Sequence, residues 1–390
     1  MEAFAHTPAE LFLLAATGGL LLVQAAFYGL LYNRINLRLR RLRRTPPAEP
    51  DSLPPLSVII CARNEADRLR QNLPAVLGQD YPDFEVIVIV ESDTDGSGDL
   101  LTAMSARHPR LYHSFVPPSS RHAHPRSLAL ALGVKASRHE WLVLTDASCH
   151  PQSDRWLRTL ARNCSADTGL VLGYSNWSGG KGWLHRRAAY DGLFAGMRAL
   201  GHALCRHPYL GSGRNLACRK SLLAGQQGVP SRLSLNDKHS ALFVNATATG
   251  SNTRVEVSPE AVVRAEPPAR AKDWREEKME QACTARLLRG WQRYVNGLET
   301  TSRAAFHAGW TGCVALSACH LHAAVAGAAV LCFAVRLCFQ ARVVNRTARQ
   351  LGEQRRYVWT LPVFDLLQPL QSLCWKLGGR SRRNSGILRP

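Results

Sequence analysis

The hydrophobic and polar positions divide the chain into two long apolar stretches with a patterned region between them. Residues 11–32 are almost wholly apolar, with Gln24 as the main interruption, and residues 304–341 contain no Asp, Glu or Lys. Between these stretches, short apolar runs alternate with segments in which apolar residues recur at helical spacing. Because a bilayer-spanning helix needs about 20 apolar residues, this pattern predicts a globular domain flanked by transmembrane helices.

The patterned region predicts an α/β fold with a mostly parallel sheet. Short continuous apolar runs are typical of buried parallel strands, and the segments between them each have one apolar face, as crossover helices do. We predict strands at residues 56–60, 84–90 and 141–144, and helices at residues 66–77 and 128–136. Alternating strands and helices form parallel sheets with right-handed crossovers, and these bind ligands outside the carboxyl ends of the strands. We therefore expect functional residues just after each strand.

The first apolar stretch predicts a signal anchor. Glu2 and Glu10 precede it, and the arginines of residues 34–44 follow it. A cleavable signal peptide has basic residues before its apolar core, whereas basic residues after a span collect on the cytoplasmic side. We therefore expect an anchor at residues 1–33 with its N-terminus outside, a basic and Pro-rich linker at residues 34–55, and a cytoplasmic globular domain at residues 56–300.

The second apolar stretch is long enough for two helices. A single crossing would place the basic residues 342–356 outside, whereas a hairpin returns them to the cytoplasm. We expect a hairpin over residues 301–341 that turns near residues 318–322, followed by a basic cytoplasmic segment at residues 342–390. The last apolar piece, residues 357–377, contains two prolines and Asp365, which favours an interfacial helix over a full span. Together these features predict a multi-pass protein of the inner (plasma) membrane.

The net charge and the cysteines narrow the choice of partners. Lys and Arg number 49 against 29 Asp and Glu, a net charge of +20. The arginines cluster directly after the first apolar stretch and in the C-terminal tail, and no nucleic-acid-binding motif with interleaved aromatic residues is visible. We therefore expect the charge to face membrane lipids and not nucleic acid. The 11 cysteines include no pair at C-x-x-C spacing, which argues against a disulfide framework or a structural zinc site.

Several short motifs occur in order between about residues 55 and 285. They are SVIICARNE at residues 57–65, QDYP at 79–82, VESDTDGS at 90–97, LALALGVK at 128–135, LTDAS at 144–148 and GSGRNLA at 211–217. Together they resemble the family 2 glycosyltransferases, in the branch of membrane-bound bacterial members. The resemblance implies a GT-A fold and transfer of a sugar, with inversion, from a nucleotide diphosphate sugar to a membrane-associated acceptor, either lipid-linked or a cell-envelope polysaccharide.

The resemblance also assigns roles to residues that follow the strands. A divalent cation held by oxygen ligands neutralises the leaving diphosphate, and a general base activates the acceptor hydroxyl. Contact with the nucleotide diphosphate sugar falls on Asn64, Glu65, Glu91, Asp93, Arg126 and Asp146. The ligands of Mg2+ or Mn2+ are Asp146 and Ser148. The base is Asp237 or His239.

The motifs depart from the family pattern at three places. Ser148 stands where the metal-binding D-x-D motif has its second carboxylate. The acidic GDDDLF cluster aligns with residues 238–243, which contain no carboxylate, so that Asp237 is displaced and His239 is the titratable group in register. In the QKxRH element, aligned with residues 277–281, Glu280 replaces a basic residue and would repel a diphosphate.

Most candidates also have a structural alternative. Asn64 is a good N-cap for the helix that follows it, and Asp and Gly are common in turns such as residues 91–96. Asp146 has a surface turn as its alternative. Arg214 and Asn215, which follow two glycines, are either acceptor contacts or turn structure.

Two functions of different classes follow from these features. The first is a membrane-anchored glycosyltransferase. The second is a catalytically inactive homologue that acts as a membrane scaffold or regulatory subunit for a partner glycosyltransferase, and the three departures favour it. Binding of anionic lipids through the arginine clusters is a third possibility that needs no active site.

Overall fold

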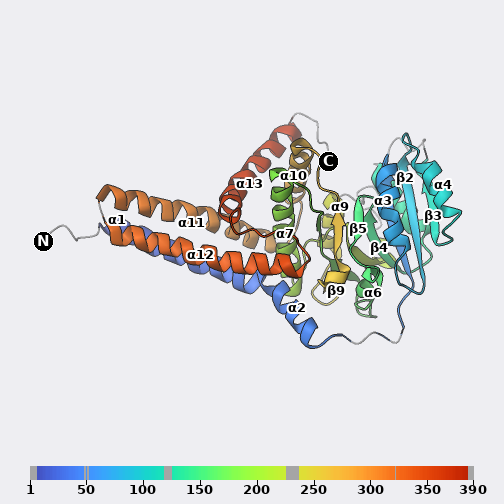
Figure 1. Ribbon diagram of the computed structural model, residues 1–390, viewed down its shortest axis with the longest axis horizontal. Coiled ribbons are helices and arrows are strands. Elements are labelled where there is room, and N and C mark those ends of the chain that lie inside the picture. Colours follow the sequence, from blue (N-terminus) through green and yellow to red (C-terminus); the bar gives the residue numbers. More distant parts are fainter. Residues whose placement is uncertain are drawn as a thin grey trace. The chain divides into compact units, whose positions relative to one another are not determined.

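A computed structural model describes residues 7–47, 50, 52–117, 125–224, 237–320 and 322–384. The chain divides into two compact units, whose elements are labelled in Figure 1. Residues 37–289 form an α/β unit, and residues 1–36 and 290–390 form a helical unit. All the described strands belong to the α/β unit.

The α/β unit is built on a seven-stranded sheet with the order β3-β2-β1-β4-β8-β6-β9. The strands β3, β2, β1 and β4 run parallel to one another, β8 is antiparallel to β4 and β6, and β9 is parallel to β6. The bounds are β1 Leu56–Arg63, β2 Phe84–Ser92, β3 Leu111–Phe115, β4 Trp141–Asp146, β6 Leu170–Gly173, β8 Leu216–Arg219 and β9 Thr253–Glu256. This mostly parallel sheet confirms the predicted α/β fold class.

The central strands are apolar on both faces and are covered by helices. Residues 56–62 of β1 and residues 84–90 of β2 are all buried. The helices between the parallel strands are α3 Ala66–Leu77, α4 Ser97–Ser105 and α5 Pro125–Ala136. A Cβ on Gly133 of α5 would come within 2.7 Å of the Ile59 side chain, so glycine allows α5 to pack directly on β1.

The second half of the α/β unit holds a small three-stranded sheet and several helices. The sheet has the order β5-β10-β7, with bounds β5 Cys149–Pro151, β7 Ser175–Trp177 and β10 Val263–Ala265. The helices are α6 Trp156–Ala161, α7 Trp183–Leu204, α8 Lys220–Ala224, α9 Asp237–Thr247, the 3-10 helix η2 Pro259–Ala261 and α10 Ala271–Thr284. Sequence reasoning predicted none of these strands, because each is only three residues long and shows no usable periodicity.

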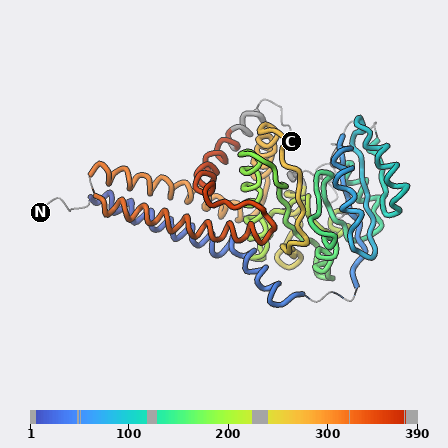
Figure 2. The backbone as a smooth tube through the Cα atoms, viewed as in Figure 1, coloured from blue at the N-terminus to red at the C-terminus, as the bar shows by residue number. Residues whose placement is uncertain are grey.

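In the helical unit, α1, α11 and α12 pack side by side, and Figure 2 shows α12 running back along α11. The bounds are α1 Pro8–Ala26, the π-helical segment η1 Phe27–Tyr32, α11 Gln292–His320, α12 Ala323–Gln350 and α13 Leu361–Asn384. Helix α2 (Arg34–Arg44) occupies the first part of the segment expected to be a linker. Helix α11 ends at His320, and α12 begins at Ala323.

Within the described residues, two helices are long and apolar enough to cross a membrane. They are the continuous helix of Pro8–Arg44 and helix α12. Their length and composition indicate membrane association.

A buried ionic cluster joins the three C-terminal helices. Asp365 of α13 lies 2.6 Å from Arg336 of α12 and 2.9 Å from His307 of α11. Arg303 of α11 also pairs with Asp365, and it forms a second ion pair with Glu299. Because a buried charge is stable only when it is paired, this cluster holds α13 against α11 and α12. Asp365 is therefore a structural residue, and its partners could not be predicted from the sequence.

Candidate active site

The carboxyl ends of β1, β2 and β4 meet at one edge of the large sheet. Strand β1 lies between the other two, and Cys61 of β1 is in register with Asp146 at the end of β4. The predicted donor-site residues of the three turns therefore gather at this edge. They are Asn64, Glu65, Glu91, Asp93, Asp146 and Ser148.

Asn64 links the turns that follow β1 and β2. Its side-chain oxygen accepts a hydrogen bond from the Thr94 N–H at 3.1 Å, and its own N–H donates to the Ser92 carbonyl at 3.2 Å. Its φ of 52° lies in the left-handed region, where Asn is tolerated better than most residues. Glu65, and not Asn64, occupies the N-cap position of α3. Asn64 is thus a turn residue that fixes the shape of the edge.

Two carboxylates of the acidic turn cap helices. Asp95 accepts hydrogen bonds from the Ala66 N–H at 2.7 Å and from the Ser97 hydroxyl at 2.6 Å, and these bonds hold the pKa of Asp95 below its usual range. Asp93 accepts from the Gly98 N–H at 3.1 Å. Carboxylates are favourable at helix N-termini because they satisfy N–H groups and oppose the helix dipole. The structure therefore supports the alternative that Asp93 is a turn residue.

Asp146 and Ser148 form a local turn that contains one carboxylate. The Ser148 N–H and hydroxyl both donate to the same oxygen of Asp146, at 3.1 and 2.9 Å. The pair offers one carboxylate, so a Mg2+ or Mn2+ ion held here would take its other oxygen ligands from water and from the substrate phosphates. Among the described side chains, no group of three or more His, Cys, Asp or Glu is arranged to hold a metal.

Glu65 lies close enough to Asp146 for the two charges to interact. Burial and the neighbouring Asp146 carboxylate raise the pKa of Glu65 above its usual range. Arg68 opposes this effect, because it pairs with Glu65 at 2.5 Å and with Glu266 at 2.9 Å. The Glu266 N–H in turn donates to the Ser148 carbonyl at 3.1 Å. Arg68 and Glu266 are therefore part of the edge, and neither was predicted from the sequence.

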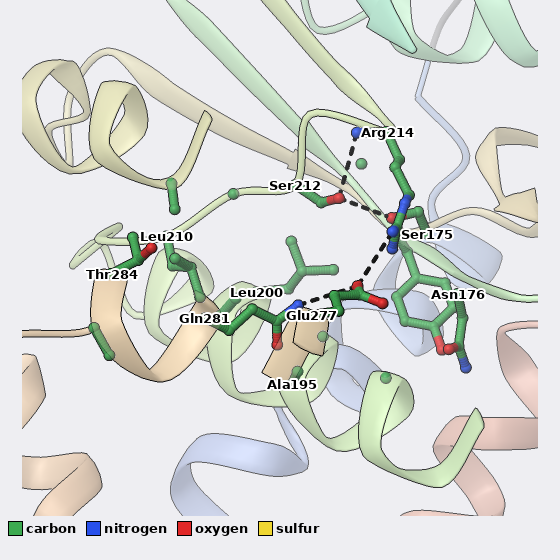
Figure 3. A pocket seen from close by; sticks show the side chains of 18 of the residues that line it. Ser175, Asn176, Ala195, Leu200, Leu210, Ser212, Arg214, Glu277, Gln281 and Thr284 are labelled. Atoms are coloured by element: carbon green, nitrogen blue, oxygen red, sulfur yellow. Dashed lines mark hydrogen bonds and ion pairs between the residues drawn. The ribbon is translucent and has the colours of Figure 1, made fainter. Parts of the chain in front are cut away.

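A pocket of about 190 Å³ lies between α7, α10 and the loop before β8 (Figure 3). Its lining combines polar residues with small and aliphatic ones. The polar residues include Ser175, Ser212, Arg214, Glu277 and Gln281. The apolar residues include Ala195, Ala199, Leu200, Leu210 and Leu288. The pocket therefore suits a ligand with both polar and apolar parts.

Arg214 and Lys278 are the cations that line this pocket, and Arg214 belongs to the loop before β8. Its guanidinium lies over the Trp177 ring at 4.2 Å from the centroid and 3.2 Å from the Glu277 carboxylate. Glu277 also accepts a hydrogen bond from Gln281 at 3.3 Å, as the dashed lines of Figure 3 show. Of the two roles considered for Arg214, the position in the pocket favours a ligand contact.

Asn215, the next residue, is structural. Its side-chain N–H groups donate to the carbonyls of Tyr174 and Ala261, each at 2.8 Å. Its side-chain oxygen accepts from the Trp156 indole at 3.1 Å, and Asn215 is 1% exposed. With these three bonds the amide ties the loop before β8 to three other segments.

Helix α10 presents different residues to the pocket from those the motif alignment suggested. Glu277, Lys278 and Gln281 line it, whereas Glu280 is exposed and is not among the lining residues. Lys278 is buried and forms an ion pair with Asp191 of α7. The helical period therefore turns Glu277 toward the pocket and Glu280 away from it.

The remaining candidates lie where the structure describes only the backbone. Asp237 and His239 belong to the first turn of α9, and Arg126 to the first turn of α5, and their side chains are outside the described part of the chain. Two residues further along α9, Ala241 lines the pocket, and the Ser240 hydroxyl accepts from the Gly213 N–H at 3.0 Å. The predicted base thus stays a prediction, on a helix that contributes to the pocket.

Comparison with protein families decides the class. The model of glycosyl transferase family 21 matches residues 21–375. The chain belongs to glycosyltransferase family 21. The prediction of a glycosyltransferase is confirmed, and its assignment to family 2 is corrected to family 21. Short motifs at strand ends report the fold and the class of enzyme, and they did not separate the two families.

Solved structures support the fold. The chain is similar to the mannosyltransferase PcManGT from Pyrobaculum calidifontis, solved with GDP-Man and Mn2+, with a TM-score of 0.56, 17% identity, and coverage of 88% of this chain and 98% of that one. S. aureus TarS residues 1–349 with UDP-GlcNAc match with a TM-score of 0.40 and 14% identity over 84% of this chain and 92% of that one. The similarity to PcManGT shows the fold alone, and nothing is concluded from the similarity to TarS. No curated protein shows significant similarity to the chain.

Proposed function

We propose that this family 21 glycosyltransferase transfers a sugar from a nucleotide diphosphate sugar to a hydroxyl group of a membrane-associated acceptor, lipid-linked or polysaccharide. The observation that carries the proposal is the position of the pocket. Its Arg214 belongs to the loop that enters β8, and the carbonyl of Arg214 accepts a hydrogen bond from Thr145, the residue before Asp146. A donor at the carboxyl edge and an acceptor in the pocket would therefore be neighbours.

The roles within the site follow from this arrangement. Glu65, Glu91 and Asp146 would contact the donor from the ends of the parallel strands, while Asn64 and Asp93 shape the turns around it. Asp237 or His239 on α9 would accept the proton of the attacking hydroxyl, since α9 contributes Ala241 to the pocket. The similar mannosyltransferase was solved in complex with GDP-Man, which supports a nucleotide-sugar donor for this chain as well.

The helical unit would anchor the enzyme in the plasma membrane. Residues 8–44 and α12 have the length and composition of spans, and the arginines of α2 lie at the end where the positive-inside rule predicts cytoplasm. An α/β unit on the cytoplasmic side would have access to nucleotide sugars and, at the membrane surface, to an acceptor held there.

A scaffold without catalytic activity is the second candidate. The specific observation in its favour is that Asp93 and Asp95 accept hydrogen bonds from N–H groups at helix N-termini, while Ser148 contributes no charge to the turn after β4. In this case the chain would bring a partner glycosyltransferase to the membrane.

A transfer assay distinguishes the two candidates. The full chain in lipid nanodiscs would be incubated with radiolabelled UDP-sugars and GDP-sugars and with lipid and polysaccharide extracts of the producing cells. We expect label to enter one acceptor fraction, and Asp146→Ala to abolish that incorporation. Asp167→Ala is the matched control, because Asp167 is exposed and lies three residues before β6, at the opposite edge of the sheet. Absence of transfer from every donor by folded protein would favour the scaffold.

A further inference from the structure

The charge of the donor poses a problem for this site. A nucleotide diphosphate is a concentrated anion that has to be neutralised when it binds and when it leaves. The turn after β4 supplies one carboxylate and one hydroxyl, so the protein contributes a single anionic ligand there to any divalent cation. The part of α10 that faces the pocket contributes Glu277, and its one lysine there, Lys278, is committed to Asp191. Arg68, the cation already placed at this edge, is paired with Glu65 and Glu266, so a further cation from another element would assist neutralisation.

Arg214 is placed to supply it. Strand β8 is antiparallel to β4, with Leu216 paired to Leu144, so the loop that enters β8 lies at the carboxyl end of β4. The Thr145 hydroxyl donates to the Arg214 carbonyl at 3.1 Å, which fixes the backbone of Arg214 next to Asp146. The residue thus comes from the edge of the sheet where the donor is expected, and its side chain extends into the pocket.

The side chain of Arg214 is braced and partly shielded from water. The guanidinium packs on the Trp177 ring, and 22% of the side chain is exposed. Stacking holds the plane of a guanidinium and leaves its N–H edge available, the edge that pairs with two oxygens of a phosphate at once. Partial burial also strengthens its charge, because solvent screens it less.

Glu277 is the present partner of this guanidinium. The two groups are 3.2 Å apart, and the Glu277 carboxylate is 23% exposed, so the pair is reached by solvent. A carboxylate in this position competes with any phosphate for the same N–H edge. We propose that Arg214 binds the diphosphate of the nucleotide sugar, and that the diphosphate replaces Glu277 as its partner. This inference rests on the proposed function, because it names the residue that holds the leaving group of that reaction.

Binding measurements on the full chain in detergent test the exchange. UDP, GDP, the matching monophosphates and the nucleosides would be titrated against wild type, Arg214→Ala, Arg214→Lys and Glu277→Gln, in buffer with EDTA. A charge-assisted bidentate contact is lost in Arg214→Ala, so we expect diphosphate affinity to fall by about 10- to 100-fold. Nucleoside affinity should not change, and Arg214→Lys should fall between wild type and Arg214→Ala. Glu277→Gln should bind the diphosphate several-fold more tightly, because the competing charge is gone.

Arg158→Ala is the matched control. Arg158 of α6 also pairs with a carboxylate, that of Asp80, at 3.3 Å, and 26% of its side chain is exposed. Asp80 precedes β2 and so lies at the amino edge of the sheet, opposite the donor edge. We expect this variant to bind diphosphates as wild type does.

The outcomes separate the inference from the function it rests on. If wild type and Arg214→Ala bind a diphosphate equally well, the proposed transferase function stands and the role of Arg214 is overturned. The role of Arg214 is equally overturned if Glu277→Gln binds the diphosphate no better than wild type, a result that does not depend on how well Arg214→Ala folds. Wild type that binds none of the probes overturns both.

Discussion

Replacing Lys278 by methionine removes the main counter-ion of Asp191, a buried carboxylate in the long helix α7. Burial alone would raise the pKa of Asp191, but the charge of Lys278, supported by Arg187 and Arg198, holds it below its usual range. Both partners of the ion pair are less than 10% exposed. Because α7 and α10 form two walls of the pocket, this pair fixes the geometry of the site as well as contributing to stability.

The size of the effect follows from the charges that stay behind. Unpairing a buried charge costs about 3–5 kcal/mol, and we expect the low end, about 3 kcal/mol, because Arg187 and Arg198 still act on Asp191. For a unit of this size that lowers the midpoint of thermal unfolding by about 6–12 °C. The assay is thermal unfolding of the full chain in detergent at neutral pH, followed by circular dichroism.

The stability difference between wild type and Lys278→Met should depend on pH. In wild type the pKa of Asp191 is lowered, so its stabilising effect is present above the unfolded value of about 3.9 and is lost as pH falls through the folded value. In Lys278→Met burial prevails and the carboxyl becomes easier to protonate. The difference in stability between the two proteins should therefore be largest at neutral pH and should narrow as pH approaches 4.

A double variant serves as the control. Asp191→Leu with Lys278→Met replaces the pair by apolar side chains and should recover most of the loss, since a buried ion pair is often worth little more than such a replacement. A single variant that loses less than about 1 kcal/mol, or a loss that is constant between pH 7 and pH 4, would refute the reasoning.

Three further substitutions have defined outcomes. Asn215→Ala leaves the Trp156 indole and two carbonyls without their partner, and it should lower the free energy of chemical unfolding by about 3 kcal/mol. The nucleotide affinity of the folded variant should stay within about twofold of wild type. A loss of affinity in a fully folded variant would make Asn215 a ligand contact. Asp365→Asn removes the carboxylate that pairs with Arg336, and it should lower the free energy of unfolding by about 3 kcal/mol. We expect a lower midpoint of thermal unfolding in detergent, and an unchanged midpoint would show that the cluster is not formed. Ser148→Asp supplies the second carboxylate of the turn and should make nucleotide binding rise with Mn2+, measured by titration with and without the metal; binding that ignores Mn2+ would show that the turn cannot hold a cation.

The parallel half of the sheet could be predicted because its signal is local. Residues 56–62 and 84–90 are apolar except for Ser57 and Glu85, and each run is buried on both faces of the sheet. Helix α3 has the bounds that its apolar spacing indicated. Strand β3, by contrast, is an edge strand with the sequence LYHSF, in which polar residues are tolerated and the pattern is lost.

The site was less predictable, because its contacts join segments far apart in the chain. The alternatives for Asn215 could not be separated from the sequence, since its partners Trp156, Tyr174 and Ala261 lie elsewhere in it. The acid that faces the pocket is Glu277 and not Glu280, a difference of almost one helical turn that an alignment of short motifs does not resolve. In the same way, the charges of the helical unit are paired across α11, α12 and α13, which no local pattern signals.

Isothermal titration of the full chain in detergent with a panel of nucleoside diphosphates, with and without Mn2+, tests the central claim most directly. We predict that one nucleotide binds with a stoichiometry of one, and that Asp146→Ala weakens its binding while Asp167→Ala does not. Saturable binding of one base would identify the donor class. Absence of binding by folded protein, for every nucleotide and with or without metal, would contradict the assignment of a donor site to the carboxyl edge of the sheet.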